Sequence, residues 1–335
     1  MVLVTGGTGL VGSHLLYQLC RSGAETKALY RSESGLEKVK KVFSYYTDAP
    51  GALLERIIWV KGDILDLPSL ETAFEGVKTV YHAAALISFD PKQHRNLEKT
   101  NVEGTANVVN LCIAHKVKKL CHVSTIGCIG RSPNGEEANE ETPWNAQHHN
   151  VYALSKKMAE MEVWRGTQEG VPAVIVNPGV VLGPGFWTSG SGRFSTAAQK
   201  GGAFYPPGGT GFVSVSSVVG AMLALMASKA QNERFILVDG NKSYRELLTA
   251  IAQHLGVRPP TRELAPWQLH LGRFLETCAS LFTGRERRLT KDTIKGLLQR
   301  QWYSTEKLEQ TVTLKKTPLS DTLAFCCAQF KKENG

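Results

Sequence analysis

A tyrosine and a lysine at helical spacing, Tyr152 and Lys156, could carry out proton transfer in this chain. Within the helix expected over 150–166, their i, i+4 spacing places the phenol and the ammonium on one face. Reducing a ketone or aldehyde builds negative charge on the carbonyl oxygen, which must be protonated as hydride arrives at carbon. A nearby ammonium favours the phenolate and lowers the pKa of the phenol, which is ordinarily about 10. The pair therefore suits an acid–base tyrosine whose lysine also holds a nicotinamide ribose.

The same spacing recurs at Tyr303 and Lys307, so the pair alone is a weak signal. Only Tyr152 closely follows an expected strand that ends in two hydroxyls, Ser124 and Thr125. Thr125 could donate a hydrogen bond to the substrate oxygen. We therefore expect the first pair in the active site and the second on a surface helix.

Glycines near the N-terminus could hold a hydride-carrying dinucleotide. Residues 2–4 form a short apolar run suited to a buried parallel strand, and Gly6, Gly9 and Gly12 lie on the turn into a helix over 13–21. Gly6 permits a tight turn, Gly9 lets the backbone approach a pyrophosphate, and Gly12 lets the helix pack closely on the sheet. The helix N-terminus adds N–H groups and a partial positive charge. The position between strand and helix favours a dinucleotide site over a turn without ligand.

The end of the next expected strand, 25–30, indicates which nicotinamide cofactor binds. NAD sites usually place Asp or Glu here to bond the ribose 2′-hydroxyl. This strand is followed by Arg31, and the nearest acid, Glu33, comes two residues later. A guanidinium can grip a 2′-phosphate with two parallel hydrogen bonds, and Lys38 either adds a second positive charge or is simply exposed. We therefore expect NADPH rather than NAD.

Further polar and small residues follow the other expected strands. Asp63 could accept a hydrogen bond from the adenine amino group or cap the next turn. The strand over 79–82 runs into three alanines, which allow a ligand to approach closely or pack against the core. Asn101 lies near the buried stripe of a long helix expected over 96–116, so its amide needs a partner.

Strands and helices alternate from residue 2 through the first half of the chain. This alternation predicts an α/β fold, a Rossmann-type doubly wound parallel sheet. Past Pro184 loops and then helices dominate. We expect an NADP-binding domain over 1–183 with returning segments such as 212–240, and a smaller, mostly helical substrate-binding lobe in 184–335. Five residues of that lobe are either pocket-lining or core: Phe186, Trp187, Arg193, Phe204 and Tyr205.

Composition restricts the class of protein. With 335 residues, 42% hydrophobic and 21% charged, the chain is an ordinary globular protein. No apolar run is long enough to span a membrane. The glycine-rich strand begins at residue 1, which leaves no room for a signal peptide. The seven cysteines are scattered and lack metal-ligand spacing, so we expect reduced thiols, no metal site and a cytoplasmic protein.

The net charge of +9 is partly concentrated in a basic segment over 285–300. This segment is either a solvated helix face or a surface that attracts an anionic ligand. Neither interleaved aromatic residues nor a nucleic-acid motif accompanies it, so we expect no nucleic-acid partner.

Taken together, the motifs resemble those of the extended short-chain dehydrogenase/reductases, the NAD-dependent epimerase/dehydratase family. The resemblance rests on T-G-G-T-G-L-V-G, G-D-I, Y-H-A-A-A, N-V-E-G-T-A-N-V, H-V-S-T-I-G-C-I-G, Y-A-L-S-K and N-P-G-V-V-L-G-P-G, and it covers most of the chain. Within the family, the chain is most similar to the dihydroflavonol-reductase-like and 3β-hydroxysteroid-dehydrogenase-like branch.

This resemblance implies roles for individual residues. Catalysis falls to Tyr152, Lys156 and Thr125, with Ser124 as the alternative hydroxyl, while Asn101 supports the lysine through a water. A homodimer through two helices of the cofactor-binding domain is also implied. Besides Tyr152 and Lys156, the residues expected to contact the cofactor are Gly6, Thr8, Gly9, Leu10, Val11, Gly12, Arg31, Lys38, Asp63, Ile64, Ala83, Ala84, Ala85, Pro178 and Val181.

The chain also departs from the family pattern. The catalytic hydroxyl is usually a serine, and counting back from Gly130 places Thr125 there. Residues 213–218 replace a segment that usually bears His and paired Asp. The family's sugar dehydratases carry Asp-Glu after the threonine, whereas Ile126 and Gly127 follow here.

The sequence therefore predicts an NADP-dependent reductase of a small or medium ketone or aldehyde, with Tyr152 as proton donor. One alternative is an NAD(P)-dependent nucleotide-sugar epimerase that uses the same residues. The other is a non-catalytic NADP-binding regulator, against which the intact set of Thr125, Tyr152 and Lys156 argues, since a sensor needs no proton donor.

Overall fold

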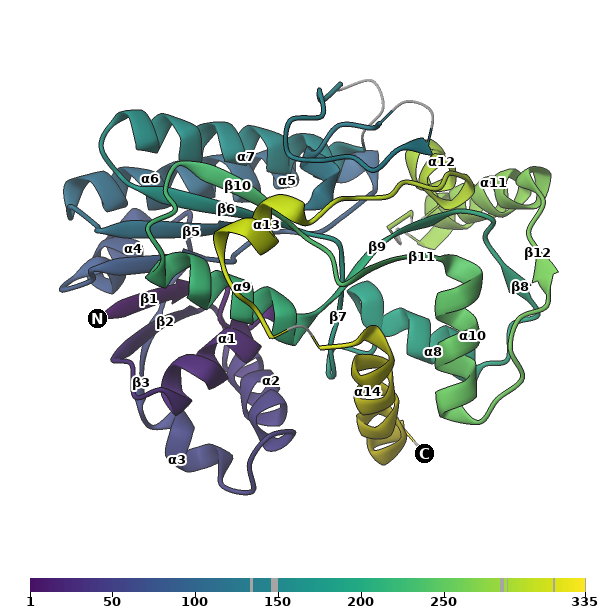
Figure 1. The fold of residues 1–335 in the computed structure, drawn as a ribbon, viewed down its shortest axis with the longest axis horizontal. Coiled ribbons are helices and arrows are strands. Elements are labelled where there is room, and N and C mark those ends of the chain that lie inside the picture. The colour runs from purple at the N-terminus through teal and green to yellow at the C-terminus, as the bar shows by residue number, and fades with distance from the viewer. Residues whose placement is uncertain (133–134, 146–149, 284–285, 288, 316, 335) are drawn as a thin grey trace.

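A seven-stranded parallel sheet forms the centre of the molecule (Figure 1). The computed structural model describes all residues except 133–134, 146–149, 284–285, 288, 316 and 335. The strand order is β10-β6-β5-β4-β1-β2-β3. The strands are β1 (Val2–Thr5), β2 (Thr26–Tyr30), β3 (Ile57–Lys61), β4 (Thr79–His82), β5 (Lys119–Val123), β6 (Ala173–Pro178) and β10 (Glu233–Leu237).

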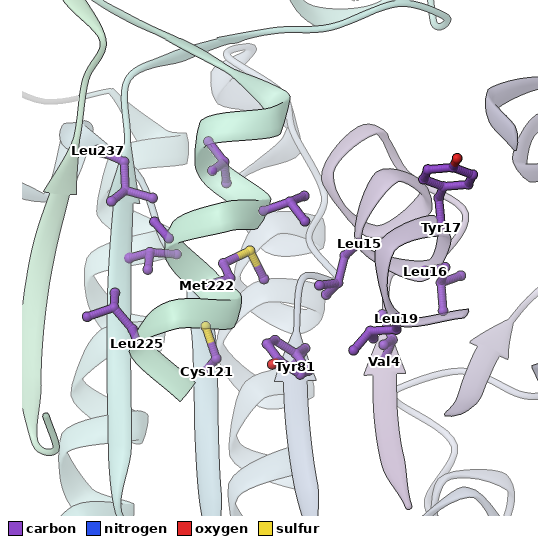
Figure 2. Close-up of a cluster of buried hydrophobic side chains, with 14 of the residues drawn as sticks. Val4, Leu15, Leu16, Tyr17, Leu19, Tyr81, Cys121, Met222, Leu225 and Leu237 are labelled. Atoms are coloured by element: carbon purple, nitrogen blue, oxygen red, sulfur yellow. The ribbon is translucent and has the colours of Figure 1, made fainter. Parts of the chain in front are cut away.

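Helices cover both faces of this sheet, which explains the nearly continuous apolar runs of its central strands. One face carries α1 (Leu10–Arg21), α2 (Glu33–Ser44) and α9 (Val215–Ala227). Figure 2 shows the core on this face, where Leu15 and Leu19 of α1 and Met222 of α9 lie over the strands. The other face carries α4 (Leu67–Phe74), α6 (Gly104–Ala114) and α7 (Val151–Gln168), and the short α3 (Pro50–Leu54) follows α2. The expected doubly wound α/β fold is confirmed.

The strand order reverses at β1, which lies between β2 and β4. The connections on either side of β1 therefore leave in opposite directions and open a crevice at the carboxyl ends of the strands. Ligands of doubly wound sheets bind in this crevice.

A second hydrophobic core lies beyond β6. It forms around a three-stranded sheet of β7 (Val180–Leu182), β9 (Gly209–Ser214) and β11 (Gly240–Ser243). Helices α8 (Arg193–Gln199), α10 (Tyr244–Leu255) and α14 (Leu319–Asn334) pack on it. The remaining elements are β8 (Phe204–Tyr205), β12 (Arg262–Glu263), α11 (Pro266–Thr283), α12 (Lys291–Leu298) and α13 (Glu306–Thr311).

Of the aromatic residues weighed as pocket-lining, Trp187 packs this second core. Its ring meets Phe330 edge-on at 5.2 Å, and its Nε1 donates to Glu333 at 2.7 Å. Tyr205 is also buried, whereas Phe204 is 43% exposed. Arg193 donates to the Thr188 carbonyl at 2.9 Å.

The expectation of a surface helix carrying Tyr303 and Lys307 is wrong. Helix α13 begins only at Glu306, so Tyr303 precedes it. The Tyr303 ring is buried against β10, and Lys307 pairs with Glu233 at 3.0 Å. An i, i+4 spacing brings two side chains onto one helix face only where both residues belong to the helix, and Tyr303 lies outside α13.

The basic segment 285–300 is only partly a solvated face. Arg285 and Arg288 lie outside the described residues. Arg287 is three-quarters buried and pairs with Asp90 at 2.8 Å.

All seven cysteines are free thiols, and six of them are buried. Within the described part of the chain, no helix combines the length and apolarity needed to cross a membrane.

Candidate active site

The turn between β1 and α1 fits glycine at two positions for different reasons. Gly6 has a φ of +71°, and a Cβ there would lie 2.4 Å from the Ala84 nitrogen at the end of β4. A Cβ on Gly12 would lie 2.1 Å from the Gly6 carbonyl oxygen. Gly12 thus lets α1 pack on the turn itself rather than on the strands. Helix α1 begins at Leu10 with Gly9 as its N-cap, so no side chain covers its first N–H groups.

We expect Gly12→Ala to weaken both NADPH binding and folding, since the added methyl must displace the Gly6 backbone. A cost of about 1–3 kcal/mol in the free energy of unfolding is typical of such overpacking. Gly220→Ala is the matched control, because a Cβ there meets nothing within 4 Å and lies inside α9. Thermal unfolding and NADPH titration measure both effects. An unchanged Gly12→Ala protein would contradict the tight-turn interpretation.

A groove of about 310 Å³ runs along the carboxyl ends of β1–β4. The sequence-predicted residues that line it are Gly6, Thr8, Gly9, Arg31, Lys38, Asp63, Ile64, Ala83, Ala84 and Ala85. The groove also includes residues that the sequence analysis missed, namely Leu29, Ser32, Ser34, Gly35, Gly62, Leu86 and Thr100. The hydroxyls beside Arg31 in the stretch R-S-E-S could have been recognised, because hydroxyls and guanidinium together suit a phosphate.

Other expected cofactor contacts lie away from this groove wall. Leu10 and Val11 are half-buried in the first turn of α1, and Gly12 is buried beneath them. Pro178 is buried at the end of β6, while Val181 lies in β7 and packs on the core beneath α1 and α9.

One end of the groove is positively charged. Arg31 is 76% exposed, and its guanidinium lies 3.7 Å from the Asp63 carboxylate. An exposed pair of this kind contributes little to stability, so the guanidinium can exchange Asp63 for another anion. Glu33, the first acid after β2, accepts a hydrogen bond from the Tyr30 hydroxyl at 3.2 Å. The residues of this groove therefore fit a dinucleotide.

Helix α7 positions Tyr152 and Lys156. Asn150 caps the helix by accepting from the Ala153 N–H at 2.8 Å, which fixes the first turn that carries Tyr152. Burial raises the pKa of Tyr152 above its ordinary value, with a smaller contribution from Cys128. Burial also lowers the pKa of Lys156 to about 8. Desolvation therefore governs both groups, and it opposes the phenolate that a neighbouring ammonium favours.

Behind Lys156 lie two buried histidines that the sequence analysis missed. His122 Nε2 accepts from the Lys156 ammonium at 3.1 Å. His82, its register partner on β4, stands between the Thr5 and Thr105 hydroxyls at 2.7 and 2.9 Å. Burial lowers the pKa of His82 to about 3 and that of His122 well below its ordinary value. Both rings are therefore neutral near pH 7, which lets His122 act as an acceptor.

The two hydroxyls at the end of β5 point to different partners. Ser124 is buried and donates to the Glu160 carboxylate at 2.6 Å. Asn177 donates to the same oxygen at 2.7 Å, and Lys157 approaches the other at 3.2 Å. Thr125 is half-buried, and its hydroxyl accepts from the Gly127 N–H at 3.2 Å. A Cβ on Gly127 would lie 3.4 Å from Thr125 Cγ2 and 3.1 Å from the Ala153 methyl, so Thr125 borders the turn that carries Tyr152.

The sequence predicted one long helix over 96–116, but the part that contains Asn101 is not α-helical. A π-helical turn (Glu98–Glu103) joins α5 (His94–Leu97) to α6. The Asn101 amide accepts from the Leu86 N–H at 2.7 Å and donates to the Leu86 carbonyl and to Ser155 Oγ. It thereby ties the segment after β4 to α7, one residue from Lys156. π-Turns occur often at functional sites.

The segment after β4 also covers Tyr152. The Phe89 ring meets the Tyr152 ring edge-on at 5.7 Å. Next to it, Asp90 is buried and accepts from the Arg287 guanidinium and N–H at 2.8 and 2.9 Å. Burial acts to raise the pKa of Asp90, but the hydrogen bonds from Arg287 and Lys92 lower it overall. The 286–287 segment therefore holds Phe89 over the tyrosine.

Comparisons with known proteins agree with this geometry. Residues 2–237 match the NAD dependent epimerase/dehydratase family. Cinnamoyl-CoA reductase 1 of Oryza sativa subsp. japonica is 27% identical over 274 residues, or 78% of this chain and 77% of that protein. The bifunctional dihydroflavonol 4-reductase/flavanone 4-reductase of Malus domestica is 27% identical over 194 residues, covering 55% and 54%. The fold matches UDP-glucose 4-epimerase of Thermotoga maritima with a TM-score of 0.76 at 19% identity, covering 100% and 99% of the two chains.

Proposed function

The chain belongs to the NAD dependent epimerase/dehydratase family, and from this membership we propose that it is an NADP-dependent reductase of a ketone or aldehyde. The resemblance drawn from its motifs is confirmed, and it is an NAD(P)-dependent oxidoreductase of the extended short-chain dehydrogenase/reductase type. The direction of reaction, the cofactor and the roles of single residues form the proposal.

The observation that carries the proposal is the charged end of the groove. Arg31 and Lys38 line the same groove as the glycine turn, together with the hydroxyls of Ser32 and Ser34. The side chain of Glu33 is engaged with Tyr30 instead. Guanidinium, ammonium and hydroxyl groups complement a 2′-phosphate, and the phosphorylated cofactor serves mainly reductions.

In the proposed reaction, bound NADPH supplies the hydride. Tyr152 donates the proton to the carbonyl oxygen, and Thr125 donates a hydrogen bond to the same oxygen, since Ser124 is committed to Glu160. Lys156 holds the nicotinamide ribose and offsets the negative charge left on the phenol. Asn101 positions Lys156 through Ser155. The second core, which lies mainly in 184–335, supplies the substrate-binding lobe, and Phe89 excludes water from the tyrosine.

We expect Arg31→Ala to weaken NADPH binding by about 1.5–3 kcal/mol, the usual contribution of a hydrogen bond to a charged group. NADH binding should change little, because NADH has no 2′-phosphate. Lys40→Ala is the matched control, since Lys40 is exposed on α2 outside the groove. Fluorescence titration of both cofactors gives the affinities. Equal affinity of the unmodified protein for NADPH and NADH would overturn the assignment.

The stoichiometry of the reaction tests the proposed function. An epimerase restores its cofactor in each cycle, whereas a reductase exchanges it at every turnover. We expect the purified protein to oxidise one NADPH for each carbonyl reduced. Absorbance of NADPH is followed beside product analysis across aldehydes, ketones and nucleotide sugars. Conversion of a nucleotide sugar without net loss of NADPH would replace the reductase with an epimerase, and binding without any turnover would indicate a regulator.

A further inference from the structure

Helix α11 presents apolar side chains to solvent along one face. Trp267 and Phe274 are each 64% exposed, Leu275 is 59% exposed and Leu271 is 48% exposed. These positions follow the i, i+4, i+7, i+8 pattern of a single helix face. Leu269, on the opposite face, is buried in the protein. Helix α11 therefore contacts the protein on the side of Leu269 and turns a separate apolar stripe outward.

The outward face is continuous with the cover of the active site. Phe274 and Pro91 line the same cavity, of about 500 Å³. Pro91 directly follows Asp90, which pairs with Arg287, and lies two residues after Phe89, whose ring meets Tyr152 edge-on. Ile87, on the same segment, is 61% exposed. Apolar surface thus extends from α11 to the segment that covers the catalytic tyrosine.

The surroundings of α11 are positively charged. The sequence over 258–300 holds nine Lys or Arg and only four Asp or Glu, in a chain with a net charge of +9. Arg273 and Lys291 line the cavity beside Phe274 together with Asp292, while Arg287 is paired with Asp90. An apolar stripe with Trp, Phe and Leu, bordered by basic side chains, is the pattern of a helix that lies in a membrane interface.

We propose that α11 docks this protein on an anionic lipid bilayer, with Trp267, Leu271, Phe274 and Leu275 inserted among the headgroups. The basic residues around the helix complement the negative surface of such a bilayer. The same charge disfavours a second copy as the occupant, because a two-fold contact would place like charges opposite each other. Figure 1 shows α11 at the end of the molecule remote from β3, so docking leaves the cofactor-binding sheet clear of the bilayer.

The test is cosedimentation of the full-length protein with vesicles of phosphatidylcholine alone or with about 30% phosphatidylserine. The variant is Leu271→Glu with Phe274→Glu. Its control is Ile58→Glu, which places the same charge at a 44% exposed side chain on β3. Lys291→Glu tests charge alone. NADPH titration and thermal unfolding establish that each variant is folded, and light scattering gives the oligomeric state. Vesicle binding needs no turnover, so its outcome is independent of the proposed reaction.

We expect binding to phosphatidylserine vesicles that weakens with salt, and at least a tenfold loss in the α11 double variant. Lys291→Glu should weaken binding several-fold, and Ile58→Glu should leave it unchanged. Absence of vesicle binding by the unmodified protein would overturn the proposal, as would equal binding by the folded double variant. A dimer that the double variant dissociates, without vesicle binding, would show that the face is a subunit interface instead.

Discussion

Tyr152→Phe is expected to lower kcat for carbonyl reduction by about 10³-fold, the usual scale of general acid catalysis. The ring remains, so its edge-on contact with Phe89 and the first turn of α7 survive. NADPH affinity should therefore change less than about threefold, since one lost neutral hydrogen bond contributes little. Steady-state kinetics on the identified carbonyl and NADPH titration separate the two effects.

Tyr303→Phe is the matched control for this experiment. Tyr303 occupies the other Tyr-x-x-x-Lys pair and is as deeply buried as a core residue, but it packs with Ile126 and Ile236 beside β10. Removing its hydroxyl should leave kcat almost unchanged. If Tyr303→Phe were inactive and Tyr152→Phe active, the assignment of the proton donor would be wrong.

Lys156→Met should lower kcat/KM by about 10²-fold or more while making the cofactor-free protein more stable. Lys156 is 1% exposed, and burial lowers its pKa from 10.5 to about 8. The folded chain therefore bears the cost of a buried ammonium at neutral pH. Replacing the ammonium removes this cost, which corresponds to about 3 kcal/mol in the free energy of unfolding. The variant also loses the hydrogen bond to His122, which reduces the gain by about 1 kcal/mol.

The destabilisation caused by the buried Lys156 ammonium should depend on pH. Lys156 binds its proton less tightly in the folded state, with a pKa of about 8 against 10.5 for the free side chain. Below pH 8 both states are protonated and the destabilisation is complete. As the pH rises from 8 to 10.5, the folded state loses its proton first and the destabilisation disappears.

Denaturant unfolding of both proteins across this pH range measures the difference. We expect the stability advantage of Lys156→Met to be constant at neutral pH and to shrink toward pH 10.5. Lys157→Met is the control, because Lys157 is one-fifth exposed and pairs with Glu160. An advantage that did not change with pH would mean that the pKa of Lys156 is the same in the folded and unfolded states. Bound NADPH should reduce the advantage by supplying partners for the ammonium.

The sequence by itself determined the features that depend on a few neighbouring residues. The glycine turn was predictable because Gly12 meets residues only a few positions away, such as Gly6, although the close approach of Gly6 to Ala84 is a long-range contact. The helical period placed Tyr152 and Lys156 together, and the alternation of strands and helices predicted the parallel sheet. Arg31 was identified because the residue after β2 always lies at the mouth of the crevice in this topology.

Only the tertiary structure decided which distant groups meet. His122 and Lys156 come from different elements, and so do Ser124 and Glu160. Likewise Asp90 and Arg287 are 197 positions apart. Their contact depends on how the whole chain packs, and no local pattern encodes it. The same holds for α11, because apolar residues at helical spacing look alike in sequence whether a neighbouring element covers them or leaves them exposed.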